Sequence, residues 1–480
     1  MRKKVLGTLA ALAASAGGAL AQSPGRGPAP AGYPDATPAQ FVNTVPAIPA
    51  MLPPGEMPVP SGDPNALAPN GLPPGGLPTY PNGGAYGQSP FDSPAMERSG
   101  LFGGRRSAGN PGLWFDGSYL LLFPKSQPLG YPLLTTSAPA DAGVVGRPTT
   151  TILQGNGGEI PLGNASGFRL SAGYFRPSDQ RIGGEFIGTY MAPISNNYFA
   201  STSSVSNGIP VLARPFINAG TGAGNGLLAS FPTYNYGSAL SHVSTQYWGL
   251  EANSLVNLYR TGEGDTRHWV LNWLVGFRYN QLAEIIDVTS RGTLLPGATG
   301  SYNGVTIASP TSVEIRDTFR TRNHFYGGQT GFQSQFSSGR FYVGVTGKIA
   351  IGFVHQEIDV TGTTNASNAA TQTSSFGVGG LLANASNIGT YRNDRFAAMT
   401  DLNGTLGYHV TPWLIGTIGY NFQHISRVVR PGSQFNGRVD PTLIPSSGSF
   451  GGASTGGQAF NIKEEDFYLH GLNFGAIIRY

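Results

Sequence analysis

The sequence has 480 residues, yet it contains no cysteine, few charged residues and, beyond its N-terminus, no long apolar run. The absence of cysteine excludes disulfides, thiolate metal sites, cysteine nucleophiles and a lipid-modified cysteine. Charged residues make up 11% of the chain, whereas soluble proteins carry about 25%. No stretch reaches the roughly 18 apolar residues of a membrane-spanning helix, so an α-helical membrane protein is excluded. The composition also argues against a soluble helical or α/β enzyme.

Glycine, proline and aromatic residues are abundant instead, with 71 Gly, 37 Pro, 21 Tyr and 26 Phe. This composition indicates an aromatic, glycine-rich all-β body joined to a proline-rich segment. The formal net charge is +4, but three of the cations, Arg2, Lys3 and Lys4, lie at the N-terminus. Without them the charge is near +1 (4 − 3), so no nucleic-acid partner is predicted.

The first 21 residues have the three parts of a secretory signal peptide. The cations at positions 2–4 are followed by an apolar stretch at 5–16 and by Ala19-Leu20-Ala21, an A-x-A cleavage site. The apolar stretch is too short for a single spanning helix. We therefore expect residues 1–21 to be removed and the protein to be exported.

Residues 22–112 carry 20 of the 37 prolines, few charges and no hydrophobic periodicity. Such a segment cannot bury a core, so we expect it to be disordered or polyproline-like. A spacer is the simpler interpretation. A periplasmic tether that contacts the cell wall is the functional alternative.

Residues 113–480 alternate between large apolar residues and small or polar residues. Between 268 and 280, for example, one face carries Trp269, Trp273 and Phe277, and the other carries Asn272 and Arg278. In a soluble sandwich the large residues would fill the core, whereas in an outer-membrane barrel they would meet lipid. Alternation alone leaves both architectures open.

The connections between ten such segments favour the barrel. They alternate between short turns and long loops, which is the plan of bacterial outer-membrane barrels. We predict a transmembrane antiparallel up-and-down β-barrel of about ten strands, with the N-terminal segment and the C-terminus in the periplasm. An additional hairpin within 282–314 would make twelve. The expected strands lie near 113–123, 166–176, 181–191, 242–259, 267–281, 315–335, 340–356, 394–409, 413–429 and 465–480.

The chain stops inside the last expected strand, with Leu472, Phe474, Ile478 and Tyr480 on one face. The insertion machinery of the bacterial outer membrane recognises aromatic-terminated last strands, so we expect these four residues to form the insertion signal. The expected partners are this machinery and outer-membrane lipid, and the expected location is the cell outer membrane.

Strand parity places seven ionisable side chains on the inner face of the barrel. Charges that face lipid would cost about 2–4 kcal/mol each near the middle of the bilayer. The near balance of four basic and three acidic residues predicts paired charges and weak ion selectivity, and structural pairing explains them as well as conduction does. A ten-stranded lumen is also narrow enough for side chains to fill it. The seven residues are Arg169, Glu185, Glu251, Arg278, Lys348, Asp401 and Arg479.

Motifs for catalysis or cofactor binding are missing. The seven histidines are scattered without the spacing of a zinc site. The glycine-rich stretch 220–226 lacks the preceding strand and following helix of a phosphate-binding loop, and no GxSxG elbow occurs. We therefore expect no cofactor, no metal and no enzymatic activity.

Several stretches of the barrel region resemble the bacterial outer-membrane β-barrel porin family numbered seven. The resemblance is collinear and covers roughly residues 113–480. It implies an outer-membrane barrel with porin activity, and it supplies no catalytic residue and no substrate. The matching stretches include 116–122, 167–175, 249–253, 275–279, 322–329, 347–352, 428–432 and 471–475.

Three functions stay open at this point. A passive diffusion channel is favoured, and a non-conducting structural or surface-display barrel whose long loops bind external partners is the alternative. An omptin-like outer-membrane hydrolase ranks last, because the sequence gives its candidate rim residues no mutual geometry. Those residues are Asp287, Asp317, His355 and Asp359.

Overall fold

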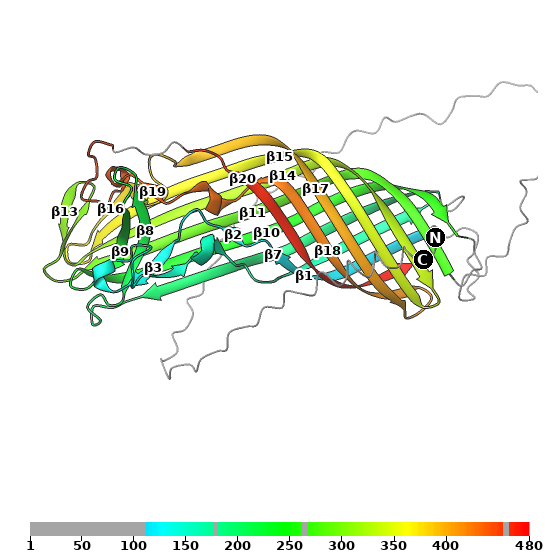
Figure 1. The fold of residues 1–480 in the computed structure, drawn as a ribbon, viewed down its shortest axis with the longest axis horizontal. Helices are drawn as coiled ribbons and strands as arrows, with labels where there is room; N and C mark the ends of the chain where they lie inside the picture. The colour runs from blue at the N-terminus through cyan, green and yellow to red at the C-terminus, as the bar shows by residue number, and fades with distance from the viewer. Residues whose placement is uncertain (1–111, 177–180, 262–266, 455–459, 480) are drawn as a thin grey trace, which may run out of the picture. The chain divides into compact units, whose positions relative to one another are not determined.

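Ten antiparallel strands close into a barrel (Figure 1). The structure is a computed structural model that describes residues 112–176, 181–261, 267–454 and 460–479. The main sheet of this part has eleven strands, and a pairing of β14 with β15 joins them into a ring that leaves out β16 (Thr373–Val378). The ring strands are β1 (Gly112–Pro124), β6 (Ala165–Phe175), β7 (Ile182–Ser201), β10 (Asn235–Arg260), β11 (Arg267–Leu294), β14 (Thr311–Ser338), β15 (Phe341–Asn368), β17 (Gly389–His409), β18 (Leu414–Val429) and β20 (Glu464–Arg479).

The ring confirms the predicted all-β up-and-down barrel. β1 pairs with β20 from Trp114 opposite Arg479 to Pro124 opposite Leu469, so the first and last strands are neighbours. The twelve-strand alternative is not realised, because residues 282–294 continue β11. The residues that follow form a separate two-stranded sheet of β12 (Thr299–Tyr302) and β13 (Val305–Ala308).

Alternation with a period of two explains the outer face of the barrel. On β15 the side chains of Phe341, Val345 and Ile349 are exposed, whereas Lys348 and Ala350 are buried. Equivalent residues on the other ring strands make an outward apolar belt, the surface that meets lipid in a membrane barrel. We call the end at which β6 joins β7, β10 joins β11, β14 joins β15 and β17 joins β18 the short-turn end.

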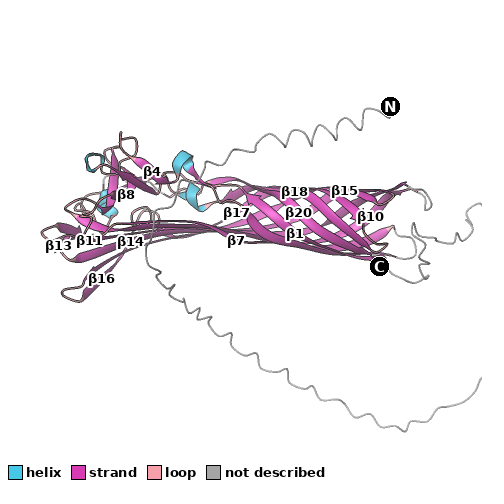
Figure 2. Cartoon of the chain, turned by 90° about the horizontal axis from the view of Figure 1, so that it is seen from below, coloured by secondary structure: helices cyan, strands magenta, loops and turns pink. Residues whose placement is uncertain are grey.

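Farther from the short-turn end the alternation inverts. On β15, Ile358 and Val360 point inward and are fully buried, whereas His355, Glu357 and Asp359 point outward. A wall with apolar residues inside and polar residues outside is the pattern of a surface in water. Figure 2 shows these long strands running past the barrel. We call this part the outer wall, made of residues 192–201, 235–246, 282–294, 311–323 and 355–368.

The long connections fold together beside the outer wall. We call this part of the structure the head. Its main sheet has the order β19-β8-β3-β4, with β9 paired to β8, and these strands gather at the left end of Figure 1. Its elements are β2 (Gln127–Pro128), β3 (Leu134–Ser137), η1 (Pro139–Asp141), β4 (Thr151–Gln154), η2 (Asn156–Gly158), β5 (Glu159–Ile160), β8 (Val211–Asn218), β9 (Gly224–Ser230), η3 (Pro431–Gln434), β19 (Arg438–Val439) and η4 (Pro441–Leu443), where η marks a 3-10 helix.

One apolar core joins the head to the outer wall. Ile286 and Phe319 of the wall share it with Leu134, Phe216 and Phe435 of the head. The rings of Phe319 and Phe435 lie 5.0 Å apart between centroids. Burying a side chain of this size stabilises by about 1.5–3 kcal/mol, so the head is an ordered part of the fold.

The predicted signal peptide (1–21), nearly all of the proline-rich segment (22–112) and Tyr480 lie outside the described residues. The predictions for them stay predictions. Within the described part of the chain, no helix has the length and apolar character needed to cross a membrane.

Candidate functional site

Five charged side chains from five strands meet in the lumen. Strand parity points them inward, and the register sets them level in pairs. Glu251 is the cross-strand partner of Arg278, and Lys348 is the partner of Asp401. We call this set the charged layer: Arg169, Glu251, Arg278, Lys348 and Asp401.

The ion pairs of the charged layer cross the lumen. Lys348 Nζ lies 2.6 Å from Glu251 Oε2 and 3.6 Å from Asp401 Oδ2. Arg278 Nη2 contacts Glu251 and lies 2.5 Å from Asp401 Oδ2. The pair of Arg278 and Asp401 links β11 to β17, past the intervening β14 and β15. Arg169 Nη2 completes the set at 3.9 Å from Glu251 and 3.8 Å from Asp401.

Three of these charged side chains have almost no accessible surface. Arg278 is 0% exposed, Asp401 is 0% exposed and Lys348 is 2% exposed. Side chains with almost no accessible surface do not line a water-filled channel. A buried charge is costly unless it is paired, and each carboxylate here lies against several cations.

Amide side chains extend the charged layer to Glu185. Gln329 Nε2 donates to Glu251 Oε2 at 3.0 Å and to Asn253 Oδ1 at 2.6 Å. Asn253 Nδ2 in turn donates to Glu185 Oε2 at 3.4 Å. Six of the seven inner charges predicted from the sequence are therefore connected, with three cations against three acids.

Arg479, the seventh predicted residue, lies apart from the charged layer. Its guanidinium lies over the ring of Tyr342, 5.6 Å from the centroid, and its Nη2 atom is 3.5 Å from Gln335 Oε1. Tyr342 packs with Ile415 and Ile477 in a small apolar cluster. Arg479 thus contributes to a separate group of inward side chains.

A second layer of inward side chains is apolar. Tyr247 is its one member with a polar group, and the hydroxyl accepts a hydrogen bond of 2.6 Å from Asn280 Nδ2 on the neighbouring strand. Seven members of the layer, including Met191 and Met399, have no exposed surface. We call this set the apolar layer: Leu120, Leu122, Ala165, Met191, Tyr247, Leu282, Phe325, Ala350, Val354, Ala397, Met399, Ile425, Val428, Phe467 and Leu469.

A third contact lies where the head enters the barrel. The pairing of β18 with β20 shifts between Ile425 and Val428, and the chain then brings Arg430 inward. Arg430 Nε and Nη2 donate to the two carboxylate oxygens of Glu284 at 2.9 and 2.8 Å. Asn323 exchanges two hydrogen bonds of 2.8 Å with the backbone of Val429.

The four residues of the hydrolase hypothesis do not converge. Asp317 points inward, contacts Arg214 of the head, and accepts hydrogen bonds from the amides of Leu381 at 3.2 Å and Ala383 at 2.7 Å. It therefore fastens the head to the outer wall.

The other three residues point outward and have separate partners. Arg316 Nε lies 2.8 Å from Asp287, His355 Nδ1 lies 2.7 Å from Asp394, and Thr390 donates to Asp359 at 2.7 Å. Within the described ranges, no group of three or more potential ligands is placed to hold a metal ion.

The predicted insertion signal lies on β20. Leu472 and Phe474 are exposed on the apolar belt, and Ile478 has the same parity. Tyr480 lies outside the described residues. The structure gives these residues the expected face, and their role in insertion stays a prediction.

Sequence reasoning missed Glu284 and Arg430. Glu284 lies on the same face of β11 as Arg278, six residues farther along the strand. Extending the predicted strand beyond residue 281 would therefore have placed Glu284 on the inner face. Arg430 carries no periodic signal, because it follows the end of β18 in an irregular connection.

The comparison with protein families decides what kind of barrel this is. A family model described as "Putative beta barrel porin-7 (BBP7)" matches residues 114–480. The chain belongs to this family. Together with the closed ring and its apolar belt, this makes the protein an outer-membrane β-barrel protein. No curated protein sequence matches the chain.

Solved structures with similarity to the chain include three bacterial proteins. The outer membrane protease OmpT from Escherichia coli has 11% identity and a TM-score of 0.36, covering 78% of this chain and 100% of that one. OmpT of Vibrio cholerae has 10% identity and a TM-score of 0.11, covering 78% and 99%. A Pseudomonas aeruginosa FadL homologue has 9% identity and a TM-score of 0.17, covering 77% and 90%.

Proposed function

We propose that this porin-7 family member is a surface-display barrel: a closed outer-membrane anchor that holds the head outside the cell. The observation that carries the proposal is the buried set of ion pairs between Arg278, Asp401, Lys348 and Glu251. The apolar layer adds a second barrier. In this arrangement the short-turn end faces the periplasm.

The construction of the head supports display. Its core is shared with the outer wall, so it is held in a fixed position rather than carried on loose loops. Ordered surface loops on a rigid scaffold are a common way to present binding residues. The proposed role is therefore contact with external partners through the head.

A passive channel with weak ion selectivity is the second candidate. The family's description as a porin supports it, and the three cations and three acids of the connected lumen charges would give little preference for either sign. In this case the charged and apolar layers would have to move aside before a solute passes.

Swelling of phospholipid vesicles in isotonic sugar solutions tests the choice. The chain without residues 1–21 is refolded into vesicles, and altered gel mobility of the unboiled sample verifies folding. If the barrel is a closed anchor, vesicles that contain it swell no faster than protein-free vesicles. Vesicles with an open porin, assayed in parallel, swell faster. Swelling whose rate falls with sugar size would overturn the display proposal and support the channel.

A further inference from the structure

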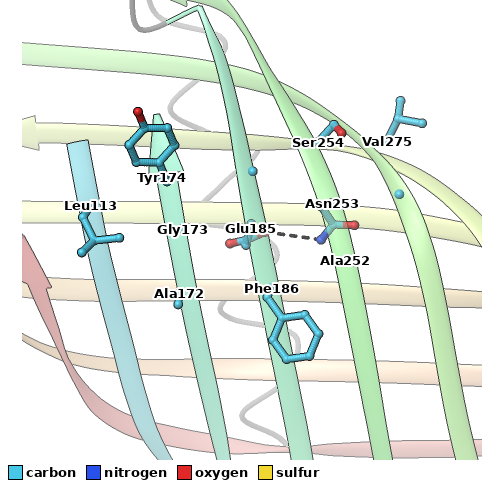
Figure 3. A pocket seen from close by; sticks show the side chains of 12 residues that line it. Leu113, Ala172, Gly173, Tyr174, Glu185, Phe186, Ala252, Asn253, Ser254 and Val275 are labelled. Atoms are coloured by element: carbon cyan, nitrogen blue, oxygen red, sulfur yellow. Dashed lines mark hydrogen bonds between the residues drawn. The ribbon is translucent and has the colours of Figure 1, made fainter. Parts of the chain in front are cut away.

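The outward face of the barrel has a recess of about 530 Å³ near the short-turn end (Figure 3). The edge nearer the short-turn end is one row of cross-strand partners that runs over five neighbouring strands. The row consists of Leu113, Tyr174, Gly184, Ser254 and Val275.

Small residues make the floor of the recess. In the next row Phe186 stands between Ala172 and Ala252, its partners on either side. Gly184 and these two alanines leave a hollow, and the exposed rings of Tyr174 and Phe186 form its sides. This mainly apolar hollow, which we call the slot, lies on a face that meets lipid and has the chemistry for an acyl chain.

The lumen charges do not reach this recess. Glu185 and Asn253 border it, and their buried side chains are hydrogen-bonded to each other (Figure 3). The surface of the recess is therefore mainly apolar.

Two basic residues lie in the connection between β6 and β7, beyond the edge of the recess at the short-turn end. Arg176 directly follows β6 and lies two residues after Tyr174. An extended chain covers about 7 Å over these two residues. Arg181 directly precedes β7, the return strand of the same hairpin, and both arginines are exposed. With Asp179 between them, the hairpin carries a net charge of +1. Guanidinium groups are the preferred partners of phosphate oxygens.

We propose that this recess binds one phospholipid of the leaflet at the short-turn end, with an acyl chain in the slot and the phosphate at Arg176. The apolar slot and the charged end match the two halves of such a molecule. The inference holds for either proposed function, because it concerns the outer face and not the lumen.

Native mass spectrometry of the refolded chain in detergent, titrated with phosphatidylglycerol, tests the proposal. The unaltered barrel is expected to retain one lipid after the non-specific lipids are removed. Gly184→Leu fills the slot, and a Cβ there meets no atom closer than 3.8 Å, so the variant is expected to fold. Arg176→Gln removes the phosphate contact. Arg176→Gln is expected to weaken retention about tenfold, the value of one charge-assisted hydrogen bond. Gly184→Leu is expected to weaken retention at least as much, because the acyl chain can no longer enter the slot.

Two variants serve as matched controls. Gly188→Leu places the same side chain on the same face of β7 outside the recess, where a Cβ meets Leu250 at an ordinary 3.6 Å. Arg340→Gln removes a basic residue from another short connection. Both are expected to retain the lipid.

Equal retention by all five proteins would mean an unspecific lipid shell and would overturn the proposal. Loss only in Arg176→Gln would overturn the acyl-chain slot. If Gly184→Leu does not fold, Ala252→Leu fills the same slot and gives the same test.

Discussion

Asp401 lies near three cationic side chains, with Arg278 at 2.5 Å, Lys348 at 3.6 Å and Arg169 at 3.8 Å from Oδ2. In the buried lumen these charges have little water to solvate them, so each depends on its partners. Asp401→Asn would leave the three cations with Glu251 and the more distant Glu185. We expect it to lower the free energy of unfolding by about 3–5 kcal/mol, measured by urea unfolding in lipid vesicles.

A partly exposed ion pair provides the control for this change. Lys125 Nζ lies 3.0 Å from Glu465 Oε2 in a position that water reaches. Lys125→Gln should cost less than about 1 kcal/mol. If Asp401→Asn cost no more than Lys125→Gln, the charged layer would not be a buried, mutually dependent cluster.

The outer wall offers a test of pH dependence outside the apolar belt. Hydrogen bonds from Arg392 at 2.8 Å and Arg322 at 3.3 Å hold the pKa of Glu357 below its usual range, against an opposing effect of burial. A lowered folded-state pKa means that these contacts stabilise the fold above the unfolded pKa of about 4.3. The stabilisation is lost as the pH falls through the folded pKa.

Glu357→Gln should therefore lower stability near neutral pH and have no effect in acid. We expect a loss of less than about 1 kcal/mol, because this pair of contacts is partly exposed. Urea unfolding of both proteins at pH 7 and at about pH 3 measures the difference. A loss that is the same at both pH values would contradict the assigned role of the carboxylate.

At the scale of elements, Asp317 fastens the connection between β15 and β17 to the outer wall. Asp317→Asn keeps the size of the side chain but removes the charge that faces Arg214. We expect faster hydrogen exchange in residues 379–388 while the ring strands stay protected, because the apolar core still holds the remaining head. Asp359→Asn, on the outside of the wall, is the matched control. Unchanged exchange in both variants would refute the fastening role.

The last strand closes the ring, so its end should be needed for assembly. Residues 474–479 pair with 114–119 of β1 and partly with 414–418 of β18. Deleting residues 474–480 removes these pairings and the outward Phe474 and Ile478. We expect the protein to remain in the periplasm and to lose the altered gel mobility of the unboiled barrel. Normal membrane insertion of the truncated chain would contradict the insertion signal.

The period of two explains how much of these elements could be predicted. Parity places Glu251, Arg278, Lys348 and Asp401 on the inner face, because one face of each strand has to meet lipid. The same reasoning predicts that the strand from residue 267 ends near residue 281, because the alternation inverts there, whereas β11 continues to Leu294. Beyond residue 281, Ile286 and Val288 are buried inside while Asp287 faces out, so the sequence there looked like a loop.

The head could not be predicted in this way. Its strands have two to eight residues, and its contacts join segments far apart in the chain, such as Arg430 with Glu284 and Arg214 with Asp317. Neither pair follows from periodicity. Such long-range contacts depend on how the connections fold back over the outer wall.

At the scale of the whole molecule, the barrel suits lipid, whereas the outer wall suits water. The apolar belt requires lipid, whereas on β15 the outward residues of the outer wall, His355, Glu357 and Asp359, are polar. The charged layer, the apolar layer and the contact of Arg430 with Glu284 fill the lumen at successive levels. This arrangement is the basis of the proposed closed anchor that carries an ordered head.

Single-channel current in a planar lipid bilayer tests the closed lumen most directly. The refolded chain without residues 1–21 is used, and its altered gel mobility before boiling shows that it is folded. The account predicts a silent membrane, with no current steps beyond those of protein-free lipid. Discrete and reproducible steps from the folded protein would contradict it.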